Sequence, residues 1–318
     1  MAFPDGWSTR RPTLDDLPAI LELMRANDIA ATGEPETGED AVRAALTSPH
    51  VDPARDCWLA YGPDGRLGGW AYIDNDNGGD KEFVEVYVHP DGGAPCRRPL
   101  LDLVLRRVAE RAAEHGFAEV TAKAGALPAE TDYIADIEAV GFRFEKRYAR
   151  MRRSLSDIAP APLPRGVTIR LVRPDDDEDL RLFHRIYDTG FRDAYDYHPR
   201  DYDSWRAYVD GLTSVAWDEW FVAEVDGVPA GVLMSADQFL EHNEAFVKNL
   251  AVLREFRRRG VGGALLRHAF AVYAAKGRAQ VGLGVDMTSP TKAANLYLAA
   301  GMTAIYEADI FAQQVKAA

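Results

Sequence analysis

Apolar and polar positions along this 318-residue chain follow an order that occurs twice, with an offset of about 160 residues. Each half predicts a short strand and an amphipathic helix, two strands around an Asp-Gly turn, a strand leading into a helix, and a helix closed by glycine. The corresponding segments are 8–24 and 168–187, 58–72 and 221–234, 82–90 and 245–253, and 137–143 and 297–303. Each half therefore predicts an α/β or α+β sandwich around one mixed sheet.

A proline-rich segment separates the two halves. Residues 156–166 read SDIAPAPLPRG, and their three alternating prolines make an extended, stiff spacer. The chain length also suits two domains of about 150 residues each. We predict an N-terminal domain at 1–155, a linker at 156–166 and a C-terminal domain at 167–318.

Composition narrows the classes of function and location. Apolar residues make up 47 %, which predicts a buried core, and the net charge of −13 argues against binding to nucleic acid or an anionic membrane. No apolar run approaches the ~18 residues of a membrane-spanning helix, and the N-terminus lacks the apolar core of a signal peptide. Cys57 and Cys96 are the only cysteines, and no Cys/His cluster has metal-ligand spacing. We expect a soluble, cytoplasmic protein without a metal.

A cluster of glycines and arginines stands where a predicted strand becomes a predicted helix. The pattern Arg257-x-x-Gly260-x-Gly262 follows a strand that ends near Val252, and an apolar helical face continues after it. A helix N-terminus has unpaired backbone N–H groups and a positive partial charge, so it binds anions. Glycines allow close approach of a ligand, and arginines bind phosphate. The turn therefore predicts a pyrophosphate site.

Three phosphate-binding patterns compete for this turn. The Walker pattern needs Lys and Ser/Thr after its second glycine, and neither is present; the dinucleotide pattern needs glycine at the position of Leu265. The remaining pattern, Arg/Gln-x-x-Gly-x-Gly/Ala, is that of the GNAT acyltransferases. Residues 250–266 resemble the GNAT strand, loop and helix that hold the pyrophosphate of acetyl-CoA, and residues 289–302 resemble the following helix. The duplicated layout resembles tandem GNAT proteins of the mycothiol synthase type.

This resemblance implies two tandem GNAT-like domains, each with a mixed, mostly antiparallel sheet flanked by helices. It implies that the backbone of Leu250, Ala251 and Val252 holds the thioester and the pantetheine arm. Tyr297, four residues before a glycine, would protonate the departing thiolate, while Ser289 stands near the place of a cofactor-orienting asparagine. Arg257 would add charge around a pyrophosphate wrapped by the amides of Arg258, Arg259, Gly260, Val261, Gly262, Gly263 and Ala264.

The N-terminal half departs from this pattern. When the two halves are aligned on the helix that follows the loop, Pro99 and Leu101 stand at the positions of Gly260 and Gly262. Ile137 stands at the position of Tyr297. Proline removes an amide and leucine adds bulk. We expect a degenerate, non-catalytic GNAT-like domain; the alternative is that a gap in the alignment hides a working loop.

The sequence gives weaker signals for the residues that would bind or deprotonate the amine that accepts the acetyl group. Mycothiol synthases carry a glutamate at the position of Phe246, and Glu244 is a shifted substitute for this general base, or else a solvated strand end. Asp193, Asp196 and Tyr197 lie in a segment of interleaved carboxylates and aromatics that suits an organic ammonium, or else decorates a helix surface.

The residues thus predict an acetyl-CoA-dependent N-acetyltransferase acting on a small, cationic amine by direct attack on the thioester. Two alternatives stay open: a protein or peptide N-acetyltransferase, and a non-catalytic acetyl-CoA sensor. We expect a small-molecule amine substrate, no nucleic-acid or membrane partner, and a monomer or homodimer.

Overall fold

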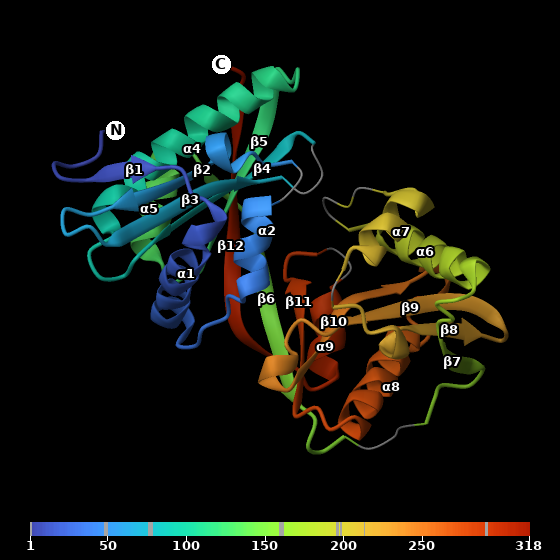
Figure 1. Ribbon diagram of the computed structural model, residues 1–318. Helices are drawn as coiled ribbons and strands as arrows, with labels where there is room; N and C mark the ends of the chain where they lie inside the picture. The colour runs from blue at the N-terminus through green and yellow to red at the C-terminus, as the bar shows by residue number, and fades with distance from the viewer. Residues whose placement is uncertain are drawn as a thin grey trace. The chain divides into compact units, whose positions relative to one another are not determined.

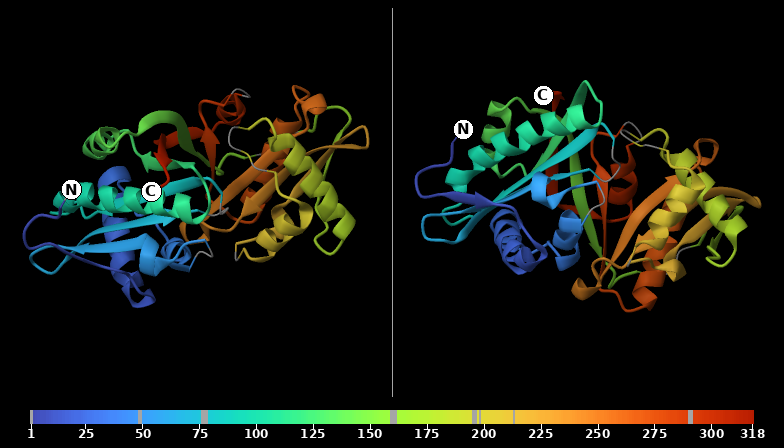
Figure 2. Two further views of the ribbon diagram at one scale, coloured as in Figure 1. Left: turned by 90° about the horizontal axis from the view of Figure 1, so that it is seen from above. Right: turned by 45° about the horizontal axis from the view of Figure 1, so that its top comes forward.

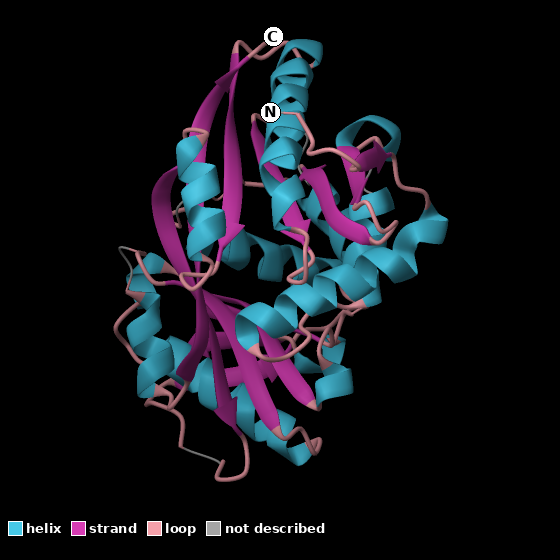
Figure 3. Ribbon diagram, turned by 90° about the vertical axis from the view of Figure 1, so that its left-hand side faces the viewer, coloured by secondary structure: helices cyan, strands magenta, loops and turns pink. Residues whose placement is uncertain are grey.

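The computed structural model describes residues 2–47, 50–75, 79–158, 162–194, 197, 199–212, 214–289 and 292–318. These residues form two compact units. The N-terminal unit comprises the chain up to Arg147 together with Glu307–Ala318, and the C-terminal unit comprises Tyr148–Tyr306 (Figure 1). In both units, helices cover the strands of a mixed sheet (Figure 3).

The N-terminal unit has the sheet order β1-β2-β3-β4-β5-β12. Strands β4 and β5 are parallel, whereas the other neighbours run antiparallel. Glycine in the left-handed region (Gly65, φ 78°) closes the expected β2–β3 hairpin. Its elements are β1 (Ser8–Arg10), α1 (Leu17–Thr32), α2 (Glu39–Thr47), α3 (Pro53–Asp56), β2 (Cys57–Tyr61), β3 (Leu67–Asp74), β4 (Lys81–Val88), α4 (Ala94–Glu114), β5 (Glu119–Ala126), α5 (Thr131–Ala139) and the start of β6 (Arg143–Ser154).

The C-terminal unit has the sheet order β6-β11-β10-β9-β8-β7. Here β10 and β11 are parallel and the other pairs antiparallel. Helices α6 and α7 lie on one side of this sheet and α8 on the other (Figure 2). Its elements are β7 (Val167–Leu171), α6 (Asp177–Phe191), α7 (Tyr202–Asp210), β8 (Phe221–Val225), β9 (Val228–Ala236), β10 (Glu244–Val252), α8 (Val261–Ala275), β11 (Gln280–Asp286), α9 (Ala293–Ala299) and the start of β12 (Thr303–Lys316).

The division between the units differs from the boundaries expected at 155 and 167. Strand β6, from the first half of the sequence, pairs with β11, and the end of β12, from the second half, pairs with β5. Each half of the sequence therefore completes the sheet of the other unit. A hydrophobic pattern predicts that a segment is a strand but not which strand it pairs with. Within the expected linker, residues 159–161 lie outside the described part of the chain.

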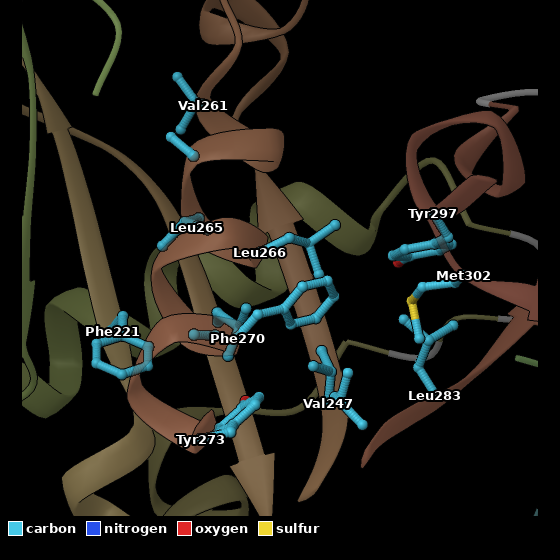
Figure 4. Packing of buried hydrophobic residues seen from close by; sticks show 14 of the residues in the cluster. Phe221, Val247, Val261, Leu265, Leu266, Phe270, Tyr273, Leu283, Tyr297 and Met302 are labelled. Carbon is cyan, nitrogen blue, oxygen red and sulfur yellow. The ribbon is translucent and has the colours of Figure 1, made fainter. Parts of the chain in front are cut away.

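The apolar face predicted for the helix after the glycine–arginine turn is confirmed. Leu265, Leu266 and Tyr273 of α8 are buried against the sheet. Figure 4 shows Leu266 and Phe270 directed toward the strands, with Tyr297 of α9 near Leu283 of β11. This packing holds the N-terminus of α8 and the body of α9 in fixed places on one sheet.

A half-buried carboxyl group in the N-terminal unit predicts a dependence of stability on pH. Tyr87 donates a hydrogen bond of 2.8 Å to Glu85, and burial raises the pKa of Glu85 to about 7. A pKa raised in the fold means that stability is lost as pH rises from the unfolded value through 7. Glu85→Gln is therefore expected to stabilise the protein by about 1–3 kcal/mol at pH 8 and little at pH 5. Urea unfolding at the two pH values measures this.

The exposed Glu138→Gln serves as the control and is expected to change stability by less than about 0.5 kcal/mol at either pH. An equal effect of Glu85→Gln at pH 5 and pH 8 would contradict the assignment, since the benefit of removing the charge exists only where the carboxyl is ionised.

Candidate acetyl-transfer site

The two parallel strands of the C-terminal unit separate partway along their length. Their pairing covers Glu244–Phe246 and Gln280–Gly282. On the other edge of β10, the register against β9 shifts between Val247 and Asn249. Such a bulge bends a strand and interrupts its ladder. The bend coincides with the end of the β10–β11 pairing, so a wedge opens between the two strands.

A cavity of about 1090 Å³ occupies this wedge and lies wholly within the C-terminal unit. That volume is at the upper end of ordinary ligand pockets. Its walls are the free parts of β10 and β11, the loop before α8, the start of α8, the end of α6 and the helix α9. Of the residues predicted to bind the cofactor, those that line it are Leu250, Ala251, Val252, Arg257, Arg258, Gly260, Val261, Gly262, Gly263 and Ser289.

The backbone at the start of α8 is arranged as an anion site. Arg258 (φ 64°) and Gly260 (φ 79°) adopt left-handed conformations, and Gly260 is the N-cap. The first intrahelical bond runs from the Ala264 amide to the Gly260 carbonyl, at 2.9 Å. The amides of the three residues between them therefore have no acceptor within the helix. A side chain at Gly262 would lie 3.2 Å from Leu296, so glycine keeps this end of the cavity open.

The arginines before α8 have different tasks. Arg257 donates to Asp193 (2.7 Å), to the Val252 carbonyl (3.0 Å) and to the Gly190 carbonyl (3.1 Å), so it ties the loop to β10 and α6. Arg258 is exposed and lines the cavity. Arg259 does not line it; its guanidinium lies 3.6 Å from Asp226. Ala264 is buried in the core, also away from the cavity.

The residues predicted to bind the substrate differ in their surroundings. Arg257 and Arg254 hold the carboxylate of Asp193 and keep its pKa below the usual value. Asp193 therefore ties the loop before α8 to α6, and in this structure its carboxylate is directed at the two arginines. Tyr197 does line the cavity, and its hydroxyl donates to Asp188 at 3.1 Å. Asp196 lies outside the described residues.

Tyr297 lies in the cavity wall on α9 and is 8 % exposed. Burial raises its pKa to about 12, so the phenol stays protonated at neutral pH. Within the described ranges its hydroxyl has no hydrogen-bond partner. A protonated, unengaged hydroxyl beside a cavity is available to donate a proton to a bound molecule.

Glu244, which the sequence suggested as a general base, lies in a buried group of ion pairs. Its side chain is 1 % exposed, and its carboxylate pairs with Arg150 and lies 2.9 Å from Nε of Arg152. It does not line the cavity. Both arginines come from β6, which the strand exchange places beside β11, so their proximity to Glu244 could not be read from local sequence.

Several polar residues of the cavity carried no motif signal. They lie on β10, on β11 and around the start of α9, and they do not belong to any sequence motif with a fixed spacing. Tyr148 comes from β6, in the other half of the sequence. These residues are Tyr148, Lys248, Asp286, Lys292 and Asn295.

The corresponding region of the N-terminal unit is built differently. Helix α4 begins at Ala94, so Pro99 and Leu101 lie inside the helix and not at its N-terminus as the alignment placed them. Gly92 (φ 87°) and the N-cap Gly93 precede the helix instead. A side chain on Gly93 would come within 2.3 Å of the Gly68 carbonyl oxygen, so backbone packs closely there. Apolar periodicity alone could not determine at which turn the helix starts.

Two further features of the described residues bear on partners. None of the described helices is long and apolar enough to cross a membrane. Within the same part of the chain, no three or more His, Cys, Asp or Glu side chains are grouped so that they could hold a metal ion.

Comparison with known proteins finds similarity to acetyltransferases. Residues 180–302 match the model of the family described as "Acetyltransferase (GNAT) family". A mycothiol acetyltransferase of Streptomyces griseus is 26 % identical over 306 residues, which cover 93 % of this chain and 92 % of that protein. A mycothiol acetyltransferase of Salinispora arenicola is 33 % identical over 177 residues, 55 % of this chain and only 53 % of that protein.

Among solved structures, a GCN5-related N-acetyltransferase from Sphaerobacter thermophilus superposes with a TM-score of 0.83 at 24 % identity. The superposition covers 99 % of this chain and 98 % of that one. The likeness confirms the expected fold over both units.

Proposed function

We propose that this chain, which through residues 180–302 belongs to the GNAT acetyltransferase family, moves the acetyl group of acetyl-CoA to the amine of a small, cationic metabolite. The observation that carries the proposal is that one cavity joins the glycine-lined N-terminus of α8 to the protonated hydroxyl of Tyr297. The first suits a pyrophosphate and the second suits a leaving thiolate. We further propose that the N-terminal unit carries no chemistry of its own.

The pyrophosphate would bind the free amides at the start of α8, with the exposed, cavity-lining Arg258 adding positive charge. The pantetheine arm would run along β10, whose edge between Val247 and Val252 has no partner in β11. This placement brings the thioester to the narrow end of the wedge, near the bulge.

The transfer needs a neutral amine, so the ammonium first loses a proton to solvent. Its nitrogen then attacks the thioester carbon and forms the C–N bond. As the C–S bond breaks, the electron pair goes to sulfur, and the thiolate takes the proton of the Tyr297 hydroxyl. The extra proton on the new amide nitrogen returns to the tyrosinate through water, which restores the phenol.

Two other functions fit parts of the site. A protein or peptide N-acetyltransferase would use the same donor chemistry with a longer acceptor. A non-catalytic acetyl-CoA sensor would need the α8 cradle but not the Tyr297 hydroxyl. The buried phenol, which has no hydrogen-bond partner among the described residues, favours an enzyme over a sensor.

Calorimetric titration with acetyl-CoA tests the donor half of the proposal. One site per chain is expected, and Gly260→Glu should weaken binding more than about 100-fold, because it adds a negative charge and a strained residue at the N-cap of α8, beside the amides proposed to bind the pyrophosphate. Gly277→Glu is the matched control: Gly277 has a similar positive φ of 82°, and a side chain there meets nothing within 4 Å.

Gly277→Glu carries the same backbone strain away from the cavity, so it should bind acetyl-CoA normally. Two sites per chain would contradict the inactive role of the N-terminal unit. Absence of binding by the wild-type protein would overturn the proposed function itself.

A further inference from the structure

The inner end of the cavity opens onto the face of the sheet opposite α8. Val281, Leu283 and Val285 of β11 point into the core beneath α8 and α9. Because side chains alternate along a strand, Gly282, Gly284 and Asp286 face the other way. In β6, which pairs with β11, Ala149 and Met151 belong to the same core, so Tyr148 also faces the opposite side.

This side of β11 is bare at one position. A side chain on Gly284 would meet no heavy atom within 4 Å, and Gly284 lines the cavity. Helix α6 packs mainly on β9 and β10. The side chains of Arg150 and Glu244 lie over Gly282, whereas Gly284 is exposed. Gly284 therefore forms the floor of an open trough, and Tyr148, paired in register with Asp286, stands at one end of it.

A lysine borders this trough without a carboxylate partner. Lys248 lies at the bulge of β10 and lines the cavity. Its ammonium group donates to the hydroxyl of Tyr208 at 3.0 Å and lies 5.2 Å from the centre of that ring. Both contacts are to a neutral side chain, and over the described ranges no carboxylate forms an ion pair with it. Among the described residues of the unit, the positive charge of Lys248 therefore has no carboxylate counter-charge.

The charge of Lys248 is too far from the α8 cradle to serve the pyrophosphate. It precedes Val252 by four residues, which along a strand is about 13 Å. Arg257, in the loop before α8, pairs with Asp193. The carboxylate of Asp193 is therefore occupied by Arg257. Lys248 thus lies where the β10–β11 pairing ends, the part of the cavity in which the thioester is proposed to sit.

We propose that the acceptor amine belongs to a molecule that also carries an anionic group, a carboxylate or a phosphate monoester, bound by Lys248 with its body over Gly284. An uncompensated ammonium beside a partly enclosed cavity attracts such a group and fixes its orientation. The proposal rests on the acetyl-transfer function argued above. The proposal narrows the expected substrate from any cationic amine to a molecule that carries both an amine and an acidic group.

Matched pairs of amines test this proposal. L-phenylalanine is compared with phenethylamine, L-leucine with isopentylamine, and glucosamine 6-phosphate with glucosamine, by release of CoA thiol from acetyl-CoA. The wild-type protein should prefer the acidic member of at least one pair by about tenfold or more in kcat/KM. Lys248→Met should abolish that preference by raising KM, and Lys248→Arg should restore most of it. The pair that responds distinguishes a carboxylate from a phosphate.

Two variants separate charge from shape. Lys316→Met removes the same charge from an exposed site in the N-terminal unit and should leave the preference unchanged. Gly284→Val fills the trough and should raise the acceptor KM about tenfold or more while leaving the calorimetric Kd for acetyl-CoA unaltered.

Preference for the neutral members, a preference unaffected by Lys248→Met, or failure to acetylate any acidic amine overturns the anionic-acceptor proposal. Binding of acetyl-CoA with turnover of neutral amines alone would overturn it while leaving the acetyl-transfer function intact. Loss of acetyl-CoA binding in the wild-type protein would overturn both.

Discussion

Replacing Tyr297 with phenylalanine is expected to lower kcat about 10²- to 10³-fold while leaving the Kd for acetyl-CoA within about twofold. The change removes one oxygen from a ring buried in the cavity wall, and within the described chain that oxygen makes no hydrogen bond. Neither packing nor folding depends on it. Steady-state kinetics and calorimetry on the same preparation measure the two quantities.

Tyr273→Phe is the matched control. Tyr273 is also a fully buried tyrosine of this unit, but its hydroxyl lies 2.6 Å from Ser235 and away from the cavity. Its loss is expected to cost about 1 kcal/mol of stability and no catalysis. If Tyr297→Phe and Tyr273→Phe left kcat equally unchanged, Tyr297 would not be the acid, and a cofactor-binding role without chemistry would gain support.

The pH profile gives a second test of the same residue. With a pKa of about 12, raised by burial, the Tyr297 phenol remains protonated throughout the range in which the protein can be assayed. The rate should therefore rise with pH as the free amine of the substrate becomes neutral, and should not fall between pH 8 and about 10. A descending limb centred below about pH 9 would contradict the role of Tyr297 as the proton donor.

Replacing Glu244 with alanine is expected to destabilise the C-terminal unit by about 3–5 kcal/mol and to leave kcat of the folded protein nearly unchanged. The carboxylate neutralises Arg150 and Arg152, and its removal leaves the buried Arg150 guanidinium without a counter-charge among the described residues. A general base would behave in the opposite manner, with a large loss of rate and a small loss of stability. Urea unfolding followed by circular dichroism, together with kinetics below the transition, distinguishes the two.

Glu241→Ala provides the comparison, because Glu241 lies three residues away and is exposed. It should change stability by less than about 0.5 kcal/mol. A loss of kcat of more than about 100-fold in Glu244→Ala, with an unfolding midpoint like that of Glu241→Ala, would restore Glu244 as the base.

Local features of the site followed from the sequence because their physics is local. The glycines of 260–263 and the apolar stripe of α8 predicted a helix start with free amides, and the structure has that helix start beside a cavity. The Asp-Gly turns predicted the two hairpins, and these are present. A helix period, a turn residue and an N-cap each depend on neighbours within about four positions.

The roles of charged residues did not follow in the same way. Asp193 and Glu244 have the chemistry of an ammonium ligand and a base, but arginines from distant positions engage both. Asp193 meets Arg257 across 64 positions, and Glu244 meets Arg150 across 94. A carboxylate can act as a base or bind a substrate only if it is not already paired with a cationic side chain. The spacing of residues in the sequence does not show which distant cations form such ion pairs.

The sequence by itself determined that the chain is duplicated, that a strand leads through glycines into a helix start with free amides, and that a tyrosine follows on the next helix. Tertiary structure alone decided which strands complete each sheet, which carboxylates are neutralised, and that Lys248 and Gly284 border one cavity. The physical reason is the range of the forces involved. Backbone conformation is set by near neighbours, whereas strand partners and ion pairs are selected by the packing of segments far apart in the chain.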